Sequence, residues 1–581
     1  MTSFGLVLGM GQSGYQWVGK NHVLTLLTTR NMEVAEYASS GNTSYQMRLL
    51  SFNESWGLQH KKVFEKDCFS PEFEKIGKEI TLKCGGLPLA ITVIAGFLSK
   101  IGKTLNEWQS VAEKVRSMVS TDVDVQCMRV LALSYHQLPH HLKTCFLYFA
   151  IFPEDEEIYV DKLVELLAAE GFLKVEETKS IEEVAEKCLQ DLIDRSSLSI
   201  DYEIFFGETK YCRIHDVIRE ICLKEARNMN IENFIGENNG QNPSALSIHF
   251  SSNSRGRTST QLNYRIIGKK LARSCPNNEA RSIFFLNSKS GFMSELLPFR
   301  LVRVLDLALM NFIVFPSGLL DLIHLRYLAL RLSPSVHYYL GKETPSSIDI
   351  PPSISRLCYL ETFIICPPPY EELTAPLYPL ILPSEILTMP QLRLLLLGWT
   401  ESITPSGAAP LDPLRFLKMR GPSPTHAVPP LLLPPADAFP QNLKALTLCM
   451  TCLWWKDLSI VGKLPKLEVL KLIGDACKGK EWEAADHGFP RLKFLYLRDV
   501  DFQYWRAGCH HFPFLERLAI LYCPYLDSIP QDFADITTLA RISLTGCPES
   551  FGNSAKQIQQ DMLDNYGNSS LVVNIVRHLL P

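Results

Sequence analysis

Four short phrases near the C-terminal end share one pattern of leucines and decide the fold: LKALTL (443–448), LEVLKL (467–472), LKFLYL (492–497) and LERLAI (515–520). Their central leucines lie 24, 25 and 23 residues apart. A strand with its return segment cannot bury such leucines alone, but stacked coils merge them into one core. Each buried leucine contributes roughly 1.5 to 3 kcal/mol. The spacing therefore predicts a solenoid of repeated coils.

The same phrase occurs six more times, as VRVLDL, LRYLAL, LETFII, LRLLLL, LRFLKM and LARISL. Steps between successive phrases run from 22 to 35 residues, and most fit the period of about 20–29 residues that is typical of leucine-rich repeats. The two longest steps contain proline-rich stretches at 367–369 and 376–383, which suit loop insertions. We predict leucine-rich repeats over residues 301–550, with Cys523 and Cys547 as packing residues inside the coils.

Residues between the leucines point outward, because successive side chains of a strand face opposite sides. We expect this outward set to line one concave face. Lys471, Phe494, Tyr496 and Arg517 are the candidate partner-binding residues in it. Mixed charge with aromatic side chains suits a protein partner. A net charge of -4 disfavours nucleic acid, which normally selects a strongly basic domain.

The bulk composition of the 581 residues is that of a multidomain globular protein. The longest apolar run, at 87–98, is too short to span a bilayer, and the N-terminus has no secretory pattern. Sixteen scattered cysteines favour reduced thiols and a cytoplasmic location. The pair Cys449 and Cys452 and the cluster 509–511 (Cys-His-His) have no companion ligands nearby in sequence, so we expect no metal site.

Prolines separate the chain into two architectures, because only four of the 36 precede Pro243. The first part carries helical periodicity. In SPEFEKIGKEITLKC (70–84), serine and proline begin a helix whose apolar residues recur every three or four positions. Nearer residue 200, two β-type stretches precede another amphipathic segment, VIREICLKEA (217–226). A hairpin followed by a helix, after several helices, predicts a winged-helix unit.

Phrases in this first part occur in the order of a known module. They are HVLTLLTTR (22–30), LLSFNESWGLQHKKVF (49–64), GLPLA (86–90), CFLYFAIFPED (145–155) and IHD (214–216). The series resembles the nucleotide-binding module of plant nucleotide-binding leucine-rich-repeat (NB-ARC LRR) disease-resistance proteins. It is most similar to the coiled-coil class, here N-terminally truncated. The resemblance covers roughly residues 20–235, and the repeats extend it to about 550.

The resemblance implies a site for ADP or ATP. Arg30 would be the sensor arginine near the phosphates, Pro88 would pack against the adenine, and His215 would contact the ADP phosphate. Without the resemblance, Arg30 would more simply pair with a carboxylate, Pro88 would mark a helix boundary, and His215 would be a satisfied interdomain histidine. These readings of the three residues remain open.

The front of the module departs from the family pattern. In GMGQSGYQ (9–16), the loop begins with glycines, but Tyr15 and Gln16 stand where lysine and a magnesium-binding hydroxyl are needed. The acidic strand that normally follows is absent before Arg30. Phosphoryl transfer depends on those groups, so we expect no catalytic residue and no enzyme activity.

These observations together predict a multidomain α/β protein with a solenoid: a remnant of a P-loop nucleotide-binding domain, helical and winged-helix domains, then the repeats. The expected function is that of an intracellular plant immune receptor recognising a pathogen effector or guarded host protein. Alternatives are a repeat-only interaction scaffold without nucleotide cycling, a true P-loop ATPase, and a DNA-binding winged-helix regulator, which the acidic run 154–157 disfavours. The expected domains are 1–60 (nucleotide-binding remnant), 61–125 (helical), 126–235 (winged helix), 236–300 (linker and repeat cap), 301–550 (repeats) and 551–581 (tail).

Overall fold

The structure is a computed structural model of the chain. The described residues are 5–8, 16–19, 22–29, 32–39, 45–64, 70–102, 104–117, 123–152, 158–173, 181–195, 199–203, 209–228, 247–250, 281–285, 299–312, 314–332, 348–366, 380–383, 385–386, 389–398, 413–421, 433–486 and 488–576. None of the helices in these ranges is long and apolar enough to cross a membrane.

The chain divides into two compact units. The first comprises Met1–Val160, Phe172–Asp201 and Tyr211–Asn228. The second comprises Asp161–Gly171, Tyr202–Lys210 and Met229–Pro581.

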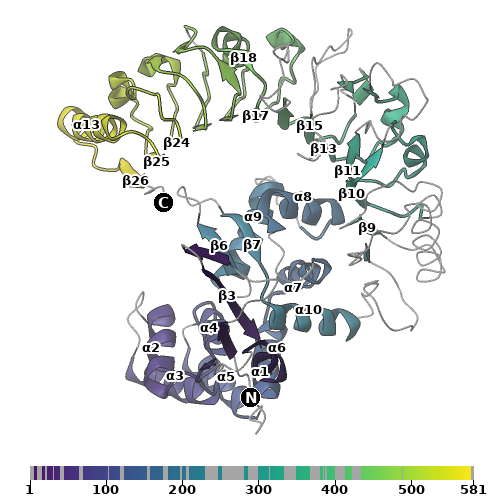
Figure 1. Cartoon of the computed structure of the whole chain (residues 1–581), viewed down its shortest axis with the longest axis vertical. Helices are drawn as coiled ribbons and strands as arrows, with labels where there is room; N and C mark the ends of the chain where they lie inside the picture. The colour runs from purple at the N-terminus through teal and green to yellow at the C-terminus, as the bar shows by residue number, and fades with distance from the viewer. Residues whose placement is uncertain are drawn as a thin grey trace. The chain divides into compact units, whose positions relative to one another are not determined.

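A group of helices forms most of the first unit (Figure 1). The predicted start of the helix at 70–84 is confirmed, with Ser70 as its N-cap and proline at its first position. Ser51 and Glu54 form a capping box that begins the preceding helix. Trp108, fully buried, packs edge-on against Phe73 at 5.2 Å between ring centroids. These helices are α1 (Met32–Ser39), α2 (Phe52–Val63), α3 (Pro71–Lys83), α4 (Pro88–Leu98), α5 (Leu105–Ser117) and α6 (Val123–His136).

The predicted winged-helix elements are present around residue 200. Three strands pair in the order β5-β7-β6, and a helix begins directly after β7. Cys222 of that last helix is fully buried against α7 and donates its thiol to the carbonyl of Phe146 at 3.4 Å. The elements are α7 (His140–Tyr148), β5 (Ile158–Tyr159), α8 (Val160–Glu170), α9 (Ile181–Asp194), β6 (Ser199–Glu203), β7 (Thr209–Arg213) and α10 (Asp216–Asn228).

The N-terminal segment forms a four-stranded sheet in the order β2-β3-β1-β4. Its strand pairs β1–β3, β1–β4 and β2–β3 are antiparallel. Strand β3 covers residues 22–29 of the HVLTLLTTR phrase. The strands are β1 (Gly5–Leu8), β2 (Gln16–Gly19), β3 (His22–Thr29) and β4 (Tyr45–Gln46).

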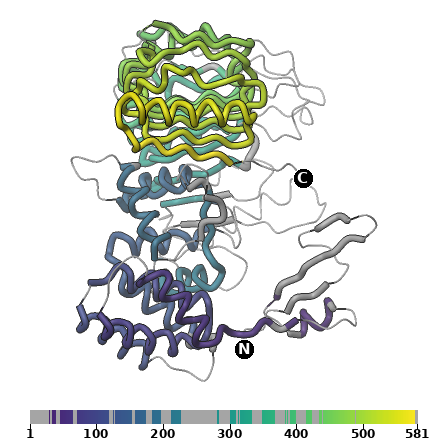
Figure 2. Tube along the Cα trace, turned by 90° about the vertical axis from the view of Figure 1, so that its left-hand side faces the viewer, coloured from purple at the N-terminus to yellow at the C-terminus, as the bar shows by residue number. Residues whose placement is uncertain are grey.

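A 13-stranded parallel sheet runs through the second unit (Figures 1 and 2). All ten leucine phrases contribute strands to it, so the predicted solenoid is confirmed. The sheet also extends beyond 301–550, because β8, β9 and β26 join it. Its strands are β8 (Ser247–Phe250), β9 (Ser282–Phe285), β10 (Val304–Phe312), β11 (Tyr327–Leu332), β13 (Thr362–Cys366), β15 (Leu394–Gly398), β16 (Phe416–Arg420), β17 (Ala445–Cys449), β19 (Val469–Ile473), β22 (Phe494–Arg498), β24 (Arg517–Leu521), β25 (Arg541–Thr545) and β26 (Val572–Val576).

The solenoid core is a continuous column of leucines under the sheet. Leu446, Leu470 and Leu495 are fully buried and occupy the same register position in successive strands. On the return side, Trp482 stacks between Trp455 and Trp505, at 5.1 and 5.3 Å between ring centroids. Side chains of one coil thus complete the core of the next, as the repeat pattern requires.

Both predicted packing cysteines contact the interior of the coils. Cys523 is fully buried, and burial raises the pKa of its thiol to about 12. Cys547 is partly buried against the core and donates its thiol to the carbonyl of Ile520 at 3.5 Å. The C-terminal end of the core is covered by α13 (Glu549–Tyr566), whose Phe551 is fully buried.

Candidate functional site

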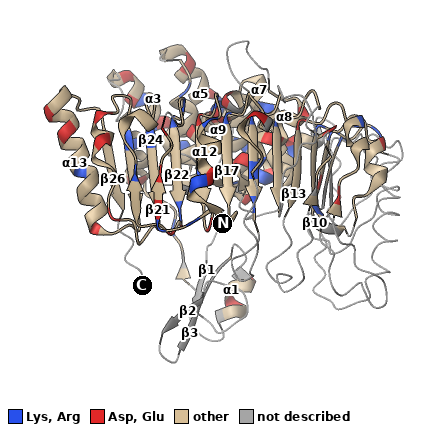
Figure 3. Cartoon of the chain, turned by 90° about the horizontal axis from the view of Figure 1, so that it is seen from above, with Lys and Arg blue, Asp and Glu red and all other residues tan. Residues whose placement is uncertain are grey.

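The outward face of the sheet carries two neighbouring rows of side chains near its C-terminal end. Strand register places Val469, Phe494 and Arg517 in one row. Lys471, Tyr496 and Ala519 form the second row, two residues further along each strand. Side chains at the same register position on paired strands are direct neighbours. The four predicted partner-binding residues therefore lie together, and Figure 3 shows lysine and arginine residues on the strands of this part of the sheet.

Phe494 is the centre of this cluster. Lys471 Nζ lies 5.9 Å and Arg517 Cζ 4.6 Å from the centroid of its ring. Two cations therefore lie over the same aromatic ring. Tyr496 packs edge-on against the same ring at 6.2 Å between centroids. Phe494 itself is only 3% exposed. The accessible part of the cluster is consequently supplied by Lys471, Tyr496 and Arg517, with Phe494 as their support.

A second feature of this unit is the packing of α8 against strands near the N-terminal end of the sheet. The residues of α8 from Leu163 to Glu170 are all buried, including both glutamates. Glu165 accepts a hydrogen bond from the Thr362 hydroxyl and pairs with Arg393, with 3.1 Å between Oε2 and Nη2. Glu170 accepts from the Ser282 hydroxyl. Buried carboxylates need such partners, so α8 is held by specific polar contacts.

Glu361, at the start of β13, completes this polar group. It lies 3.7 Å from Arg326 and 3.6 Å from Arg393. Burial raises the pKa of Glu361 to about 7, and the nearby Glu165 adds to the effect, while Arg326 opposes it. Glu165 and Glu361 therefore share the guanidinium group of Arg393. This arrangement could not be predicted from the sequence, because its members come from segments almost 200 residues apart.

The GLPLA motif forms a turn between α3 and α4 in the first unit. Gly85 and Gly86 both have left-handed backbone conformations, with φ of 64° and 76°. Leu50 donates its backbone N–H to the Gly86 carbonyl at 3.0 Å, which brings the two segments into close contact. Pro88 is the first residue of α4 and is exposed. Its position at a helix start agrees with the interpretation of Pro88 as a helix boundary. Its ring is also accessible to a ligand.

His215 immediately precedes α10 and is also exposed. The Val217 N–H donates to His215 Nδ1 at 3.3 Å, and Asp216 Oδ1 lies 2.5 Å from the same nitrogen. The imidazole is thus placed at the N-terminal end of a 13-residue helix, where the helix dipole favours anions. Helix α4, which Pro88 begins, and helix α10, which follows His215, both pack against α6.

Three sequence-derived features lie outside the described residues. They are Arg30, the glycine loop at 9–15 and the acidic run at 154–157. The functions expected for them remain predictions.

The cluster 509–511 has no companion ligands nearby in sequence, but the structure brings a carboxylate close to its two histidines. His510 and His511 lie close to Asp486, which precedes His510 by 24 residues. No sequence signal in the local window could have found this carboxylate, because only the stacking of successive coils brings it near.

Comparison with known proteins supports the module order. The NB-ARC domain family matches residues 16–68, and the "Disease resistance protein Winged helix domain" family matches residues 151–222. Late blight resistance protein R1-A of Solanum demissum is 29% identical, over 96% of this chain and 46% of that protein. Putative late blight resistance protein homolog R1B-12 of the same species is 30% identical, over 96% of this chain and 44% of that protein. The chain thus spans less than half the length of these relatives.

Among solved structures, the plant peptide hormone receptor RGFR1 in complex with RGF2 covers 52% of this chain at 15% identity, with 48% of that receptor matched and a TM-score of 0.25.

An NB-ARC segment, a winged helix and a leucine-rich-repeat solenoid in one chain define the class of nucleotide-binding, leucine-rich-repeat proteins. The chain belongs to the plant NB-ARC LRR disease-resistance proteins. The resemblance inferred from the motifs is thereby confirmed. Proteins of this family are nucleotide-binding switches and not classical enzymes.

Proposed function

We propose that this chain acts as an intracellular, cytoplasmic plant immune receptor that recognises a pathogen effector or a guarded host protein through its repeats. The relatives named as late blight resistance proteins support a role in disease resistance. The observation that carries the recognition surface is the cluster of Lys471, Phe494, Tyr496 and Arg517 on the outward face of the sheet.

The composition of this cluster supports a protein partner. Tyr and Arg are enriched among the residues that dominate binding energy in interfaces, especially where supporting side chains hold them in place. Arg517 rests on the Phe494 ring and Tyr496 packs against the ring's edge. Because both are already ordered, a partner would bind them with a smaller loss of side-chain entropy.

We propose further that ADP holds the off state and that exchange for ATP releases it, by a shift in population between two states. Bound nucleotide would supply phosphate charge that the protein must neutralise. His215 would donate to phosphate at the start of α10, and Pro88 would pack against the adenine at the start of α4. Both side chains are exposed, and a helix N-terminus favours phosphate, so the described residues fit this role. Arg30 would contribute the sensor charge.

An alternative is an interaction scaffold that uses the repeats without nucleotide cycling. Tyr15 and Gln16 stand in place of the phosphate-binding lysine and the magnesium-binding hydroxyl, which favours this alternative. Calorimetric titration of the full chain with ADP separates the two. The receptor proposal predicts saturable binding that His215→Ala weakens at least 10-fold, whereas the scaffold predicts no binding to either protein.

The recognition surface is tested by pairwise co-precipitation of the full chain with cloned, secreted effectors of a pathogen that infects the source plant. The double variant Tyr496→Ala and Arg517→Ala should lose an effector that the wild type retains. Lys456→Ala, an exposed lysine on the return side of the coils, should retain it. Equal retention by all three proteins would place recognition elsewhere on the chain.

A further inference from the structure

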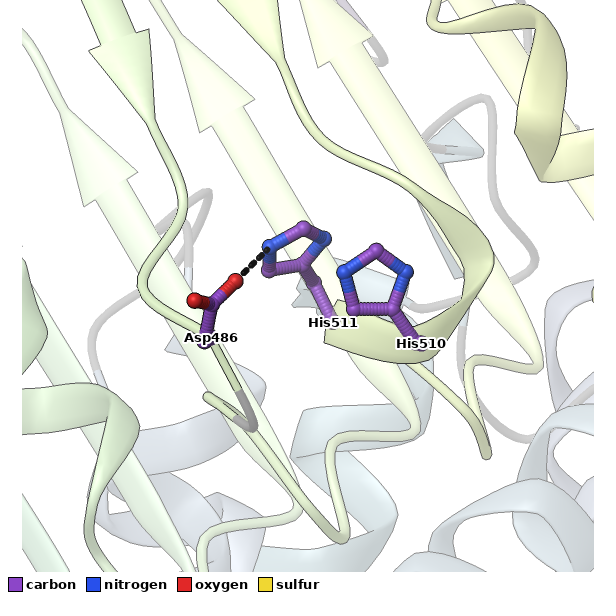
Figure 4. Close-up of side chains that lie close together, drawn as sticks. All are labelled: Asp486, His510 and His511. Carbon is purple, nitrogen blue, oxygen red and sulfur yellow. Dashed lines mark ion pairs between the residues drawn. The ribbon is translucent and has the colours of Figure 1, made fainter.

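Three potential metal ligands converge on the return side of two successive coils. Asp486, His510 and His511 each offer a ligand atom, and these atoms all lie within 4.8 Å of one another. Figure 4 shows the Asp486 carboxylate facing the His511 ring, with the His510 ring beside it. His511 Nε2 lies 3.8 Å from Asp486 Oδ1, and the two imidazole centroids are 3.9 Å apart. The group combines a fixed, buried histidine with two exposed side chains.

The Gly508 N–H bond to Nδ1 places the ring proton of His511 on Nε2, so zinc binding at Nε2 requires that proton to move to Nδ1 and this bond to be given up. Nδ1 accepts from the Gly508 N–H at 2.8 Å, and the Gly508 carbonyl oxygen lies 3.3 Å from the same nitrogen. If Nδ1 carries the proton instead, it can donate to that carbonyl, which leaves the Nε2 lone pair directed at Asp486. Metal-bound histidines usually donate their other ring N–H to a backbone carbonyl or a carboxylate in this way.

Two imidazole nitrogens and one carboxylate oxygen form a ligand set that suits zinc and similar divalent transition metals. Ligands on one tetrahedral zinc, with bonds of roughly 2.0–2.1 Å, lie about 3.4 Å apart. The present separations of up to 4.8 Å therefore need to shorten by up to about 1.4 Å. Asp486 is 91% exposed at its side chain and His510 is exposed, so both can rotate toward a buried and stationary His511.

We propose that Asp486, His510 and His511 form a zinc-binding site that links two adjacent coils of the solenoid. Asp486 follows β21 (Glu481–Glu483) in one coil, and the two histidines follow β23 (Tyr504–Arg506) in the next coil. The first coil therefore supplies one ligand and the second coil supplies two. Trp482 and Trp505 stack nearby in the same two coils. The fourth coordination position is left to water. Bound zinc adds a polar clamp to an interface that is otherwise apolar.

The test uses the full chain, purified without a histidine tag, stripped with a chelator and kept reduced. Zinc is titrated by calorimetry and counted in the dialysed protein by mass spectrometry, and Co²⁺ serves as the optical probe. The wild type should bind one zinc at this site, and its thermal midpoint should rise with zinc concentration. Asp486→Asn and His510→Gln should each weaken zinc at least about 10-fold and reduce the midpoint shift. Both positions are exposed, so the variants should fold.

His324→Gln is the matched control, because His324 is an exposed histidine of the same solenoid outside the cluster. Its zinc affinity should equal that of the wild type. The proposal is overturned if the wild type binds no zinc, or if Asp486→Asn and His510→Gln bind it as tightly as the control does. An intense thiolate-to-cobalt charge-transfer band in place of nitrogen and oxygen ligation would also overturn it, because the metal would then reside on cysteines.

Discussion

Arg393 Nη2 lies 3.1 Å from Glu165 Oε2, which joins the repeat sheet to helix α8, and both side chains are largely buried. Removing one member of such a pair leaves a buried charge without its partner, which typically costs about 3–5 kcal/mol. Glu165→Ala should therefore lower the stability of this unit by about 3 kcal/mol, seen as a lower urea midpoint. Glu483→Ala, at an exposed glutamate of β21 in the same unit, should change it by less than about 0.5 kcal/mol. Equal midpoints for the two variants would show that the contact contributes nothing.

Stability should also depend on pH through Glu361. Its pKa in the folded chain is raised from the ordinary 4.5 to about 7, chiefly by burial. Between these two values the folded state binds the proton more tightly than the unfolded state, so stability falls as pH rises from about 4.5 through 7. Glu361→Gln removes this titration. Thermal midpoints measured at pH 5.5 and 8 should differ less in the variant than in the wild type, and an unchanged difference would contradict the assignment.

The two glycines of the GLPLA turn should respond differently to alanine. Both have left-handed φ, which costs an L-residue roughly 1–2 kcal/mol. A Cβ at Gly86 would lie 2.4 Å from the Leu50 carbonyl oxygen, whereas a Cβ at Gly85 would meet nothing within 4 Å. Gly85→Ala should thus cost about 1 kcal/mol and Gly86→Ala at least about twice as much, by denaturant unfolding. A larger loss at Gly85 would disprove this account of the turn.

Adjacent residues of β22 provide a test of the solenoid itself. Leu495 is fully buried in the column of leucines, and Tyr496 points to the outward face. Leu495→Ala should cost about 2–5 kcal/mol, because it removes buried methyl groups and leaves a cavity. Tyr496→Ala should cost less than half of that in the same denaturant series. A larger loss for Tyr496→Ala than for Leu495→Ala would mean that Tyr496, and not Leu495, faces the core.

The repeats could be predicted because their signal is local: each phrase carries its own leucines, and Leu446, Leu470 and Leu495 recur at nearly constant spacing. The helix at Ser70 was likewise readable from a serine, a proline and an apolar stripe. The strand alternation also gave the outward set, although it could not show that Phe494 is covered by Lys471 and Arg517.

Contacts between distant segments could not be predicted in this way. Periodicity marks α8 as amphipathic, but it does not show that Glu165 is buried against Thr362 and Arg393. The approach of Asp486 to His511 could not be predicted for the same reason, because the two meet only when one coil stacks on the next. In both cases a polar side chain acquires its environment from tertiary packing, which a single sequence does not encode in any local pattern.

The proposed recognition surface has one direct functional test: effector-dependent cell death in leaves that express the full chain with its cognate effector. Three proteins should be compared at equal abundance: the wild type, the double variant Tyr496→Ala and Arg517→Ala, and the control Lys456→Ala. We predict cell death with the wild type and the control, and its loss in the double variant. Undiminished cell death in the double variant would contradict recognition through this face of the repeats.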